Sequence, residues 1–101
     1  MKIQLSRLYF EGNVLRVIQA KATRIKGVSN QKPYDYDLYE IEARSSLATR
    51  EFSLVVDIIK QEVSGDVIAF GSWYDLDQSS VIEILKQLKE ENQLLRTVDF
   101  L

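Results

Sequence analysis

The order of hydrophobic and polar residues predicts an antiparallel sheet in the first half of the chain. Residues Lys2–Phe10 and Val14–Ile25 are rich in β-branched, leucine and aromatic side chains, and they flank the short connection Glu11–Asn13, which contains a glycine. This arrangement is typical of a β-hairpin. Residues Tyr34–Arg44 then alternate, which predicts a third strand after the turn-like stretch Lys26–Pro33. One face of that strand would carry Tyr39, Ile41 and Ala43, and the other Tyr34, Tyr36, Leu38, Glu40 and Glu42.

The segment Arg50–Val63 fits two periods at once. Phe52, Val55, Val56, Ile59 and Val63 have helical spacing, whereas Phe52, Leu54, Val56 and Ile58 alternate as in a strand. We favour a helix, because residues 60–62 are good helix formers, Thr49 can cap its start and Ser64–Gly65 can end it. A strand stays open as the alternative.

The last third of the chain predicts a strand and a helix. Residues Val67–Tyr74 form a buried strand interrupted by Gly71. A stripe at i, i+3, i+4 and i+7 then predicts a helix, and Ser80 with Glu83 forms a capping-box pattern at its start. The stripe consists of Val81, Ile84, Leu85 and Leu88.

These elements predict an α+β fold, a three-stranded antiparallel meander followed by helix, strand and helix. If Arg50–Ile59 is a strand instead, the chain fits a small OB-like β-barrel with a C-terminal helix. No repeat or linker divides the sequence, so we expect residues 1–101 to form a single domain.

Composition narrows the chemistry. The 101 residues include no cysteine and no histidine, which excludes disulfides, thiolate nucleophiles and the commonest general base and metal ligand. The four glycines are scattered and form no phosphate-binding loop. We therefore expect no enzyme, no cofactor and no metal site. No apolar run reaches the length of a signal peptide or a membrane span, so we expect a cytoplasmic protein without membrane contact.

Two pairs of closely spaced carboxylates are the strongest remaining candidates for catalytic groups. Asp35 with Asp37, and Asp75 with Asp77, can in principle share a cation or divide acid and base roles. Structural roles explain both pairs more simply. We expect Asp77 or Ser79 near the N-terminal end of the last helix, and Asp35 and Asp37 on a solvated strand edge.

Charge is divided unevenly along the chain. Residues 1–33 carry a net charge of +6 and residues 34–101 a net charge of −8, which together give the total of −2. This asymmetry favours a surface for a polyanion at the basic end, although the two parts can also simply neutralise each other.

Basic and aromatic residues gather around one predicted hairpin. In a regular strand Arg16, Arg24 and Lys26 share a face, and Lys21 lies opposite unless a bulge shifts the register. Binders of single-stranded nucleic acid combine cations for the phosphates with rings on which bases stack. Alternatively, the tyrosines cover the sheet and the basic stems lie over it. The predicted nucleic-acid-binding residues are Arg16, Lys21, Arg24, Lys26, Lys32, Tyr34 and Tyr36.

The stretch Thr23–Tyr34, with the sequence TRIKGVSNQKPY, resembles the basic DNA-binding hairpin of filamentous-phage single-stranded DNA-binding proteins, and more loosely OB-type proteins. The resemblance implies that Arg24, Lys26 and Lys32 contact phosphates and that Tyr34 stacks on a base. It covers about a tenth of the chain.

A protein partner is the competing expectation. An acidic second part that is rich in exposed aromatic residues can dock a basic protein. The residues concerned are Tyr34, Tyr36, Tyr39, Trp73 and Tyr74. An uncovered edge strand or the apolar helix stripe can also support a homodimer, and we expect the apolar segment 94–101 to pack on the core or add an edge strand. The sequence thus predicts a small non-enzymatic module for single-stranded nucleic acid, with a protein partner as the alternative.

Overall fold

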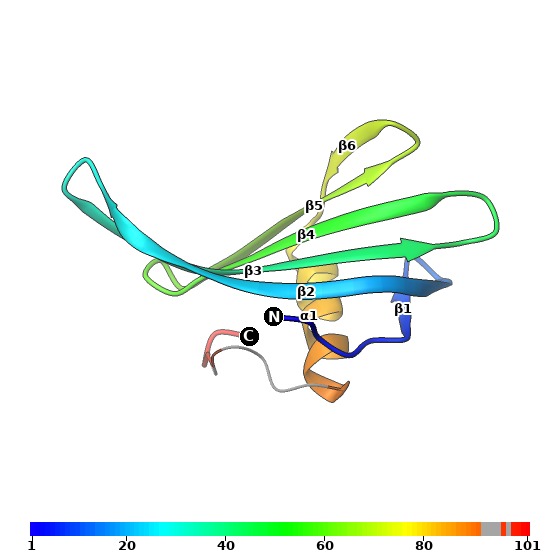
Figure 1. Ribbon diagram of the computed structural model, residues 1–101, viewed down its shortest axis with the longest axis horizontal. Coiled ribbons are helices and arrows are strands. Elements are labelled where there is room, and N and C mark those ends of the chain that lie inside the picture. The colour runs from blue at the N-terminus through cyan, green and yellow to red at the C-terminus, as the bar shows by residue number, and fades with distance from the viewer. Residues whose placement is uncertain (92–95, 97) are drawn as a thin grey trace.

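The computed structural model describes residues 1–91, 96 and 98–101. Within them, six strands form one antiparallel sheet in which every strand pairs with its neighbours in chain order (Figure 1). A helix follows the last strand and packs across one face of the sheet, which we call the inner face. The elements are β1 Arg7–Phe10, β2 Asn13–Ser29, β3 Lys32–Arg44, β4 Thr49–Asp57, β5 Glu62–Ala69, β6 Ser72–Asp75 and α1 Gln78–Glu91.

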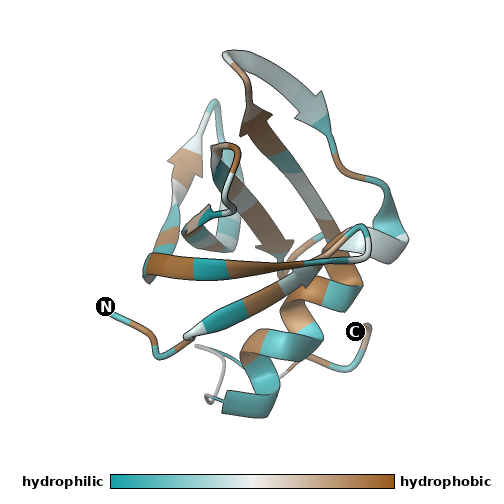
Figure 2. Cartoon of the chain, turned by 90° about the vertical axis from the view of Figure 1, so that its right-hand side faces the viewer, coloured by the Kyte–Doolittle hydropathy of each residue, from teal (hydrophilic) through white to brown (hydrophobic). Residues whose placement is uncertain are grey.

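Alternation along the strands builds the core. Successive side chains of a strand point to opposite faces, so every second residue faces the helix. On β3 these are Tyr39, Ile41 and Ala43, as predicted, and on β4 they are Phe52, Leu54 and Val56. Figure 2 shows hydrophobic and hydrophilic residues alternating along the strands above the helix. The predicted helix stripe is confirmed, because its four residues are buried against this face.

Gly65 of β5 lies on the inner face beside Val81 of the helix. A Cβ at this position would lie 2.8 Å from Leu54 Cδ2 and 3.2 Å from Val81 Cγ2. The missing side chain therefore makes room for the first turn of α1.

The predicted helix over Arg50–Val63 is wrong. Residues 49–57 form β4, a turn follows, and β5 begins at Glu62. The alternating period prevails because β4 lies between β3 and β5, where Phe52, Leu54 and Val56 all reach the inner face. Helical spacing would have left Leu54 off the apolar stripe. The alternative with more strands and a C-terminal helix is closer to the structure.

Two further boundaries differ from the prediction. Residues 67–74 contain the end of β5, a turn and β6, because Phe70 and Gly71 adopt φ angles of 53° and 76°. Such paired positive angles are the signature of a two-residue hairpin turn. The helix begins at Gln78 rather than after Ser80, since Asp77 Oδ1 accepts a hydrogen bond from Ser80 N at 2.9 Å. The capping box at Ser80 is wrong, and the expected place of Asp77 at the helix N-terminus is confirmed.

The C-terminal residues return to the core. Val98, Phe100 and Leu101 pack against the buried cluster, as expected for this segment. The other residues assigned to the same apolar segment, 94, 95 and 97, lie outside the described residues. Over the described ranges, no helix has the length and apolar character required to cross a membrane.

Candidate interaction surface

The predicted nucleic-acid-binding residues divide between the two faces of the sheet. The register of β2 shifts between Val17 and Gln19. This shift is a bulge of the kind that the sequence analysis allowed for in this long strand. Because of this shift, Arg16 and Lys21 both lie on the outer face, away from the helix, whereas Arg24 and Lys26 lie on the inner face. The expectation that Arg16, Arg24 and Lys26 share a face is therefore wrong.

The hairpin end of β2 and β3 projects as a two-stranded ribbon (Figure 1). Its outer face carries Lys32, Tyr34 and Tyr36, and the two tyrosine rings are 6.4 Å apart. Tyr34 lies across the strand pair over Gly27, where an added Cβ would collide with its ring. This placement agrees with the interpretation in which the tyrosines cover the sheet, and it separates the rings from Arg24 and Lys26.

Asp35 and Asp37 are not on a solvated edge, and that expectation is wrong. Asp37 is only 1% exposed on the inner face. Arg96 donates to it through Nε at 3.1 Å and Nη2 at 2.7 Å, and through Nη1 to Asp35 Oδ2 at 2.7 Å. These hydrogen bonds, above all those to Asp37, raise the pKa of Arg96 above its usual value. The two carboxylates thus hold the C-terminal segment on β3.

The two edges of the sheet differ. At β1, the amide of Gln87 in α1 accepts a hydrogen bond from Tyr9 N at 2.7 Å and donates to Tyr9 O at 2.9 Å. At Tyr9, the side chain of Gln87 thereby makes the two main-chain hydrogen bonds that a neighbouring strand would make. Among the described residues, no group pairs with the outer side of β6. Since an edge strand bonds its neighbour through every second residue, β6 offers free N–H and C=O groups.

Aromatic side chains gather on this free edge. Trp73 is 66% exposed, Tyr74 52%, and Phe70 in the adjoining turn 70%. Phe70 also adopts a left-handed backbone conformation, which is unfavourable for a bulky residue. Five aromatic residues were predicted for a protein-binding surface. The prediction for Tyr39 is wrong, because this residue is buried in the core.

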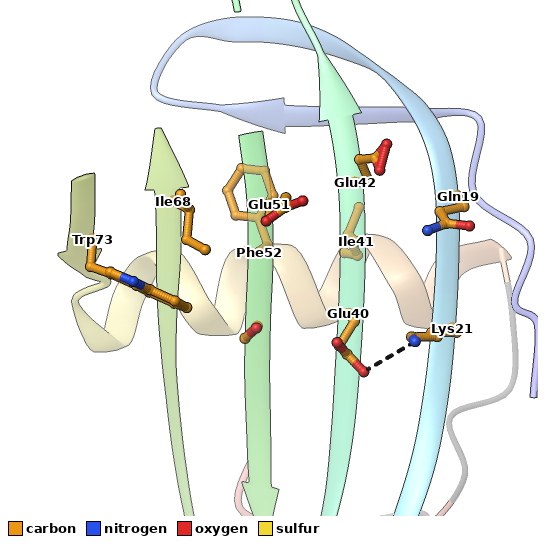
Figure 3. A pocket seen from close by; sticks show the side chains of 10 residues that line it. Gln19, Lys21, Glu40, Ile41, Glu42, Glu51, Phe52, Ile68 and Trp73 are labelled. Atoms are coloured by element: carbon orange, nitrogen blue, oxygen red, sulfur yellow. Dashed lines mark ion pairs between the residues drawn. The ribbon is translucent and has the colours of Figure 1, made fainter. Parts of the chain in front are cut away.

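A shallow acidic hollow crosses the outer face and ends at Trp73 (Figure 3). It has a volume of about 240 Å³, and Glu40, Glu42 and Glu51 line it together with Ile68. Lys21 is the basic residue in its lining, and its Nζ lies 3.7 Å from Glu40 Oε1. The lining of the hollow therefore carries a net negative charge, and Lys21 lies at the end away from β6.

The carboxylate pair Asp75 and Asp77 separates into two roles. Asp75 lies directly opposite Asp66 across β5 and β6, and a hydrogen bond between these side chains raises the pKa of Asp66. The pKa of Asp77 is lowered, chiefly by hydrogen bonds from Ser80 at the start of the helix. Two facing carboxylates thus lie beside Trp73 on the outer face.

A second pocket of about 390 Å³ lies on the inner face between the end of β1 and β6. Phe10, Phe70 and Tyr74 contribute aromatic surface, and Arg50 lies at its base. The guanidinium carbon of Arg50 is 5.6 Å from the centre of the Phe10 ring, and its buried Nε has no hydrogen-bond partner among the described residues. We call this the inner-face pocket.

Within the described part of the chain, no group of three or more acidic residues is placed to hold a metal ion. Comparison with protein-family models, with curated proteins and with solved structures found no match. The class of protein is thus defined by its architecture, a six-stranded antiparallel meander with a C-terminal helix.

Sequence reasoning found Trp73 and Tyr74 but missed the features that make them a site. Residues 67–74 were assigned to one strand, so the turn at Phe70 and the free edge of β6 did not appear. A Phe-Gly pair between two alternating runs is the signal that could have located the hairpin. The bond from Gln87 to β1 had no sequence signal.

Proposed function

We propose that the chain is a protein-interaction module that binds an extended segment of a partner by strand addition at β6. The free edge of β6, lined by exposed aromatic side chains, carries this proposal. Strand addition gains main-chain hydrogen bonds along the edge, and pockets beside the edge select the side chains. Large exposed aromatic residues are also the commonest energetic anchors of protein interfaces.

The acidic residues beside β6 indicate the charge of the partner segment. An added strand places every second side chain on the outer face, beside Trp73 and Asp75. Asp66 and Glu51 lie on the same face one and two strands further in. Basic side chains at alternate positions would pair with these carboxylates and lie over the Trp73 ring. The intervening side chains would face the aromatic inner-face pocket, so we propose an alternating basic and apolar segment.

A synthetic peptide tests this proposal directly. Trp73 is the single tryptophan of the chain, so its fluorescence reports occupation of β6. The probe is acetyl-Lys-Val-Lys-Val-Lys-Val-Lys-amide, and the charge control replaces each lysine by glutamate. We expect a blue shift of Trp73 emission on binding, and at least about tenfold weaker binding of the glutamate peptide.

Backbone methylation separates strand addition from simple charge attraction. Two further probes carry N-methyl groups on either the lysines or the valines. Because an edge strand pairs with every second residue, one of these probes should bind normally and the other should not. Equal binding of both would contradict strand addition.

Variants locate the surface. Tyr74→Ala and Asp75→Asn should weaken binding, whereas Tyr9→Ala on the covered edge is the matched control. If a second copy of the chain occupies β6 instead, Trp73 emission will shift as the protein alone is concentrated. That result would overturn the proposal of a separate basic partner.

A second candidate function is binding of single-stranded nucleic acid. Its support is that four of the five predicted basic residues, Arg16, Arg24, Lys26 and Lys32, are exposed and form no ion pair with a described residue. Anisotropy of a labelled oligothymidylate tests it, and binding that weakens between about 50 and 200 mM salt supports it. If the protein does not bind the oligothymidylate at the lower salt concentration, this second candidate function is refuted.

A further inference from the structure

Three arginines stand in a row across the first three strands. Arg7 of β1 lies directly opposite Arg16 of β2, and Arg16 lies directly opposite Arg44 of β3. Each is exposed, and each neighbours a buried inner-face residue, namely Leu8, Leu15 and Ala43. All three therefore project from the outer face. We call Arg7, Arg16 and Arg44 the arginine row.

The row is not neutralised within the described residues. None of the three arginines has a hydrogen bond or an ion pair from its side chain to another described residue. On the same face, Glu42 lies two residues from Arg44 along β3 and pairs with Glu51 of β4. Like charges directly opposite each other destabilise a sheet, so folding alone does not favour this row.

The β2 bulge is what completes the row. With a regular register through Ile18, Arg16 would share a face with Ala20 and Ala22, which are buried on the inner face. The shift between Val17 and Gln19 turns Arg16 to the outer face, between the two other arginines. Bulges are frequent where a side chain is aimed at a binding site.

A flat aromatic surface adjoins the row. Tyr9, which is 62% exposed, lies two residues along β1 from Arg7 on the same face and pairs with Val14. The backbone of Tyr9 is held by Gln87, so its ring stands on a fixed strand. Guanidinium groups bind phosphates through two parallel hydrogen bonds, and tyrosine rings stack on bases.

We propose that the arginine row is a site for single-stranded nucleic acid, with phosphates on Arg7, Arg16 and Arg44 and a base on Tyr9. This inference rests on the second candidate function and names its site. The ribbon is less suited to phosphates, because Arg24 and Lys26 lie directly opposite Asp37 and Asp35. At the arginine row, each arginine lies opposite another arginine or an uncharged residue.

The salt dependence sets the size of the effect. Neutralising three phosphates of a single strand gives a slope of roughly −2 in a plot of log affinity against log salt concentration. Between about 50 and 200 mM salt, affinity should then fall roughly 20-fold. Each arginine removed should reduce the slope by about 0.7.

Two triple variants with the same change in charge form the test. Arg7→Gln, Arg16→Gln and Arg44→Gln together remove the row, and Arg24→Gln, Lys26→Gln and Lys32→Gln together remove the ribbon cations. The probe is labelled oligothymidylate, measured by anisotropy. We expect at least a 20-fold loss for the row variant and less than about threefold for the ribbon variant. Tyr9→Leu should cost about tenfold, with Tyr36→Leu as its control.

The outcomes separate the site from the function. Salt-dependent binding that survives loss of the row but not loss of the ribbon overturns the arginine row and keeps nucleic-acid binding. No binding by the wild-type protein overturns both. Loss of the row should leave the urea midpoint unchanged or raise it, because it removes repulsion, so unfolding cannot imitate the expected result. Arg16→Gln alone should lower the salt slope, and an unchanged slope also contradicts the site.

Discussion

Removing the guanidinium group of Arg96 should destabilise the protein strongly. Arg96 donates hydrogen bonds to both oxygens of Asp37 and to Asp35, and Asp37 is almost completely buried. The variant Arg96→Met keeps the aliphatic stem but leaves the Asp37 carboxylate without its partner. Breaking a buried ion pair in this way costs about 3–5 kcal/mol. That is a large share of the roughly 5–15 kcal/mol by which such domains are stable.

Urea unfolding, followed by circular dichroism and by Trp73 fluorescence, measures the loss. With a slope of about 1.5 kcal/mol per molar urea, the midpoint should fall by roughly 2–3 M. Arg24→Met is the matched control, because Arg24 lies directly opposite Asp37 but is exposed and does not pair with it. We expect Arg24→Met to change stability by less than about 0.5 kcal/mol.

A second variant tests the reason for the loss. In Arg96→Met with Asp37→Leu, the almost fully buried carboxylate is removed, and only Asp35, whose side chain is 16% exposed, is left without its partner, so at least half of the lost stability should return. If Arg96→Met costs less than about 1 kcal/mol, or matches Arg24→Met, the pair behaves like a surface ion pair and the reasoning is refuted.

Four other predictions concern the sheet and its titrating groups. Gly65→Ala should lower the free energy of unfolding, measured in urea, by about 1–3 kcal/mol, because the new methyl group meets Leu54 and the Ser53 carbonyl. Gly27→Ala should lower it less, since its methyl group meets the Tyr34 ring, which can move. Phe70→Asn should raise stability by about 1 kcal/mol by relieving the left-handed backbone, while weakening the Lys-Val peptide, and a stability loss would contradict the strain. Because the pKa of Asp66 is raised in the folded state, the contribution of this group to stability falls as pH rises above about 3.8. Asp66→Asn should therefore be more stable than wild type at pH 7, and this advantage should shrink as the pH falls toward 3.8. The lowered pKa of Asp77 has the opposite sign, so Asp77→Ala should lose stability at pH 7 and approach wild type in acid, as unfolding curves at several pH values would show.

The candidate site was only partly predictable. The sequence named five basic residues and Tyr34, Tyr36, Trp73 and Tyr74 as candidates, because their types suit binding surfaces. It did not predict how they are grouped, since a single bulge in β2 decides which of the basic residues share a face. Arg7 and Arg44 also join Arg16 only through pairing across three strands, which no local pattern in the sequence reports.

Local patterns by themselves determined the alternation of β3 and the apolar stripe of α1, because the burial of one face imposes a period of two or of 3.6 residues. The composition, which includes no cysteine and no histidine, also determined that no thiol or imidazole chemistry is available. Only the tertiary structure decided that residues 49–57 form a strand, since both periods were present and the strands on either side selected one. It likewise decided that Asp37 is buried, because its partner Arg96 lies 59 residues away. The difference between the two edges was also decided there, because Gln87 binds β1 through a contact between residues far apart in the chain and no described group pairs with the outer side of β6.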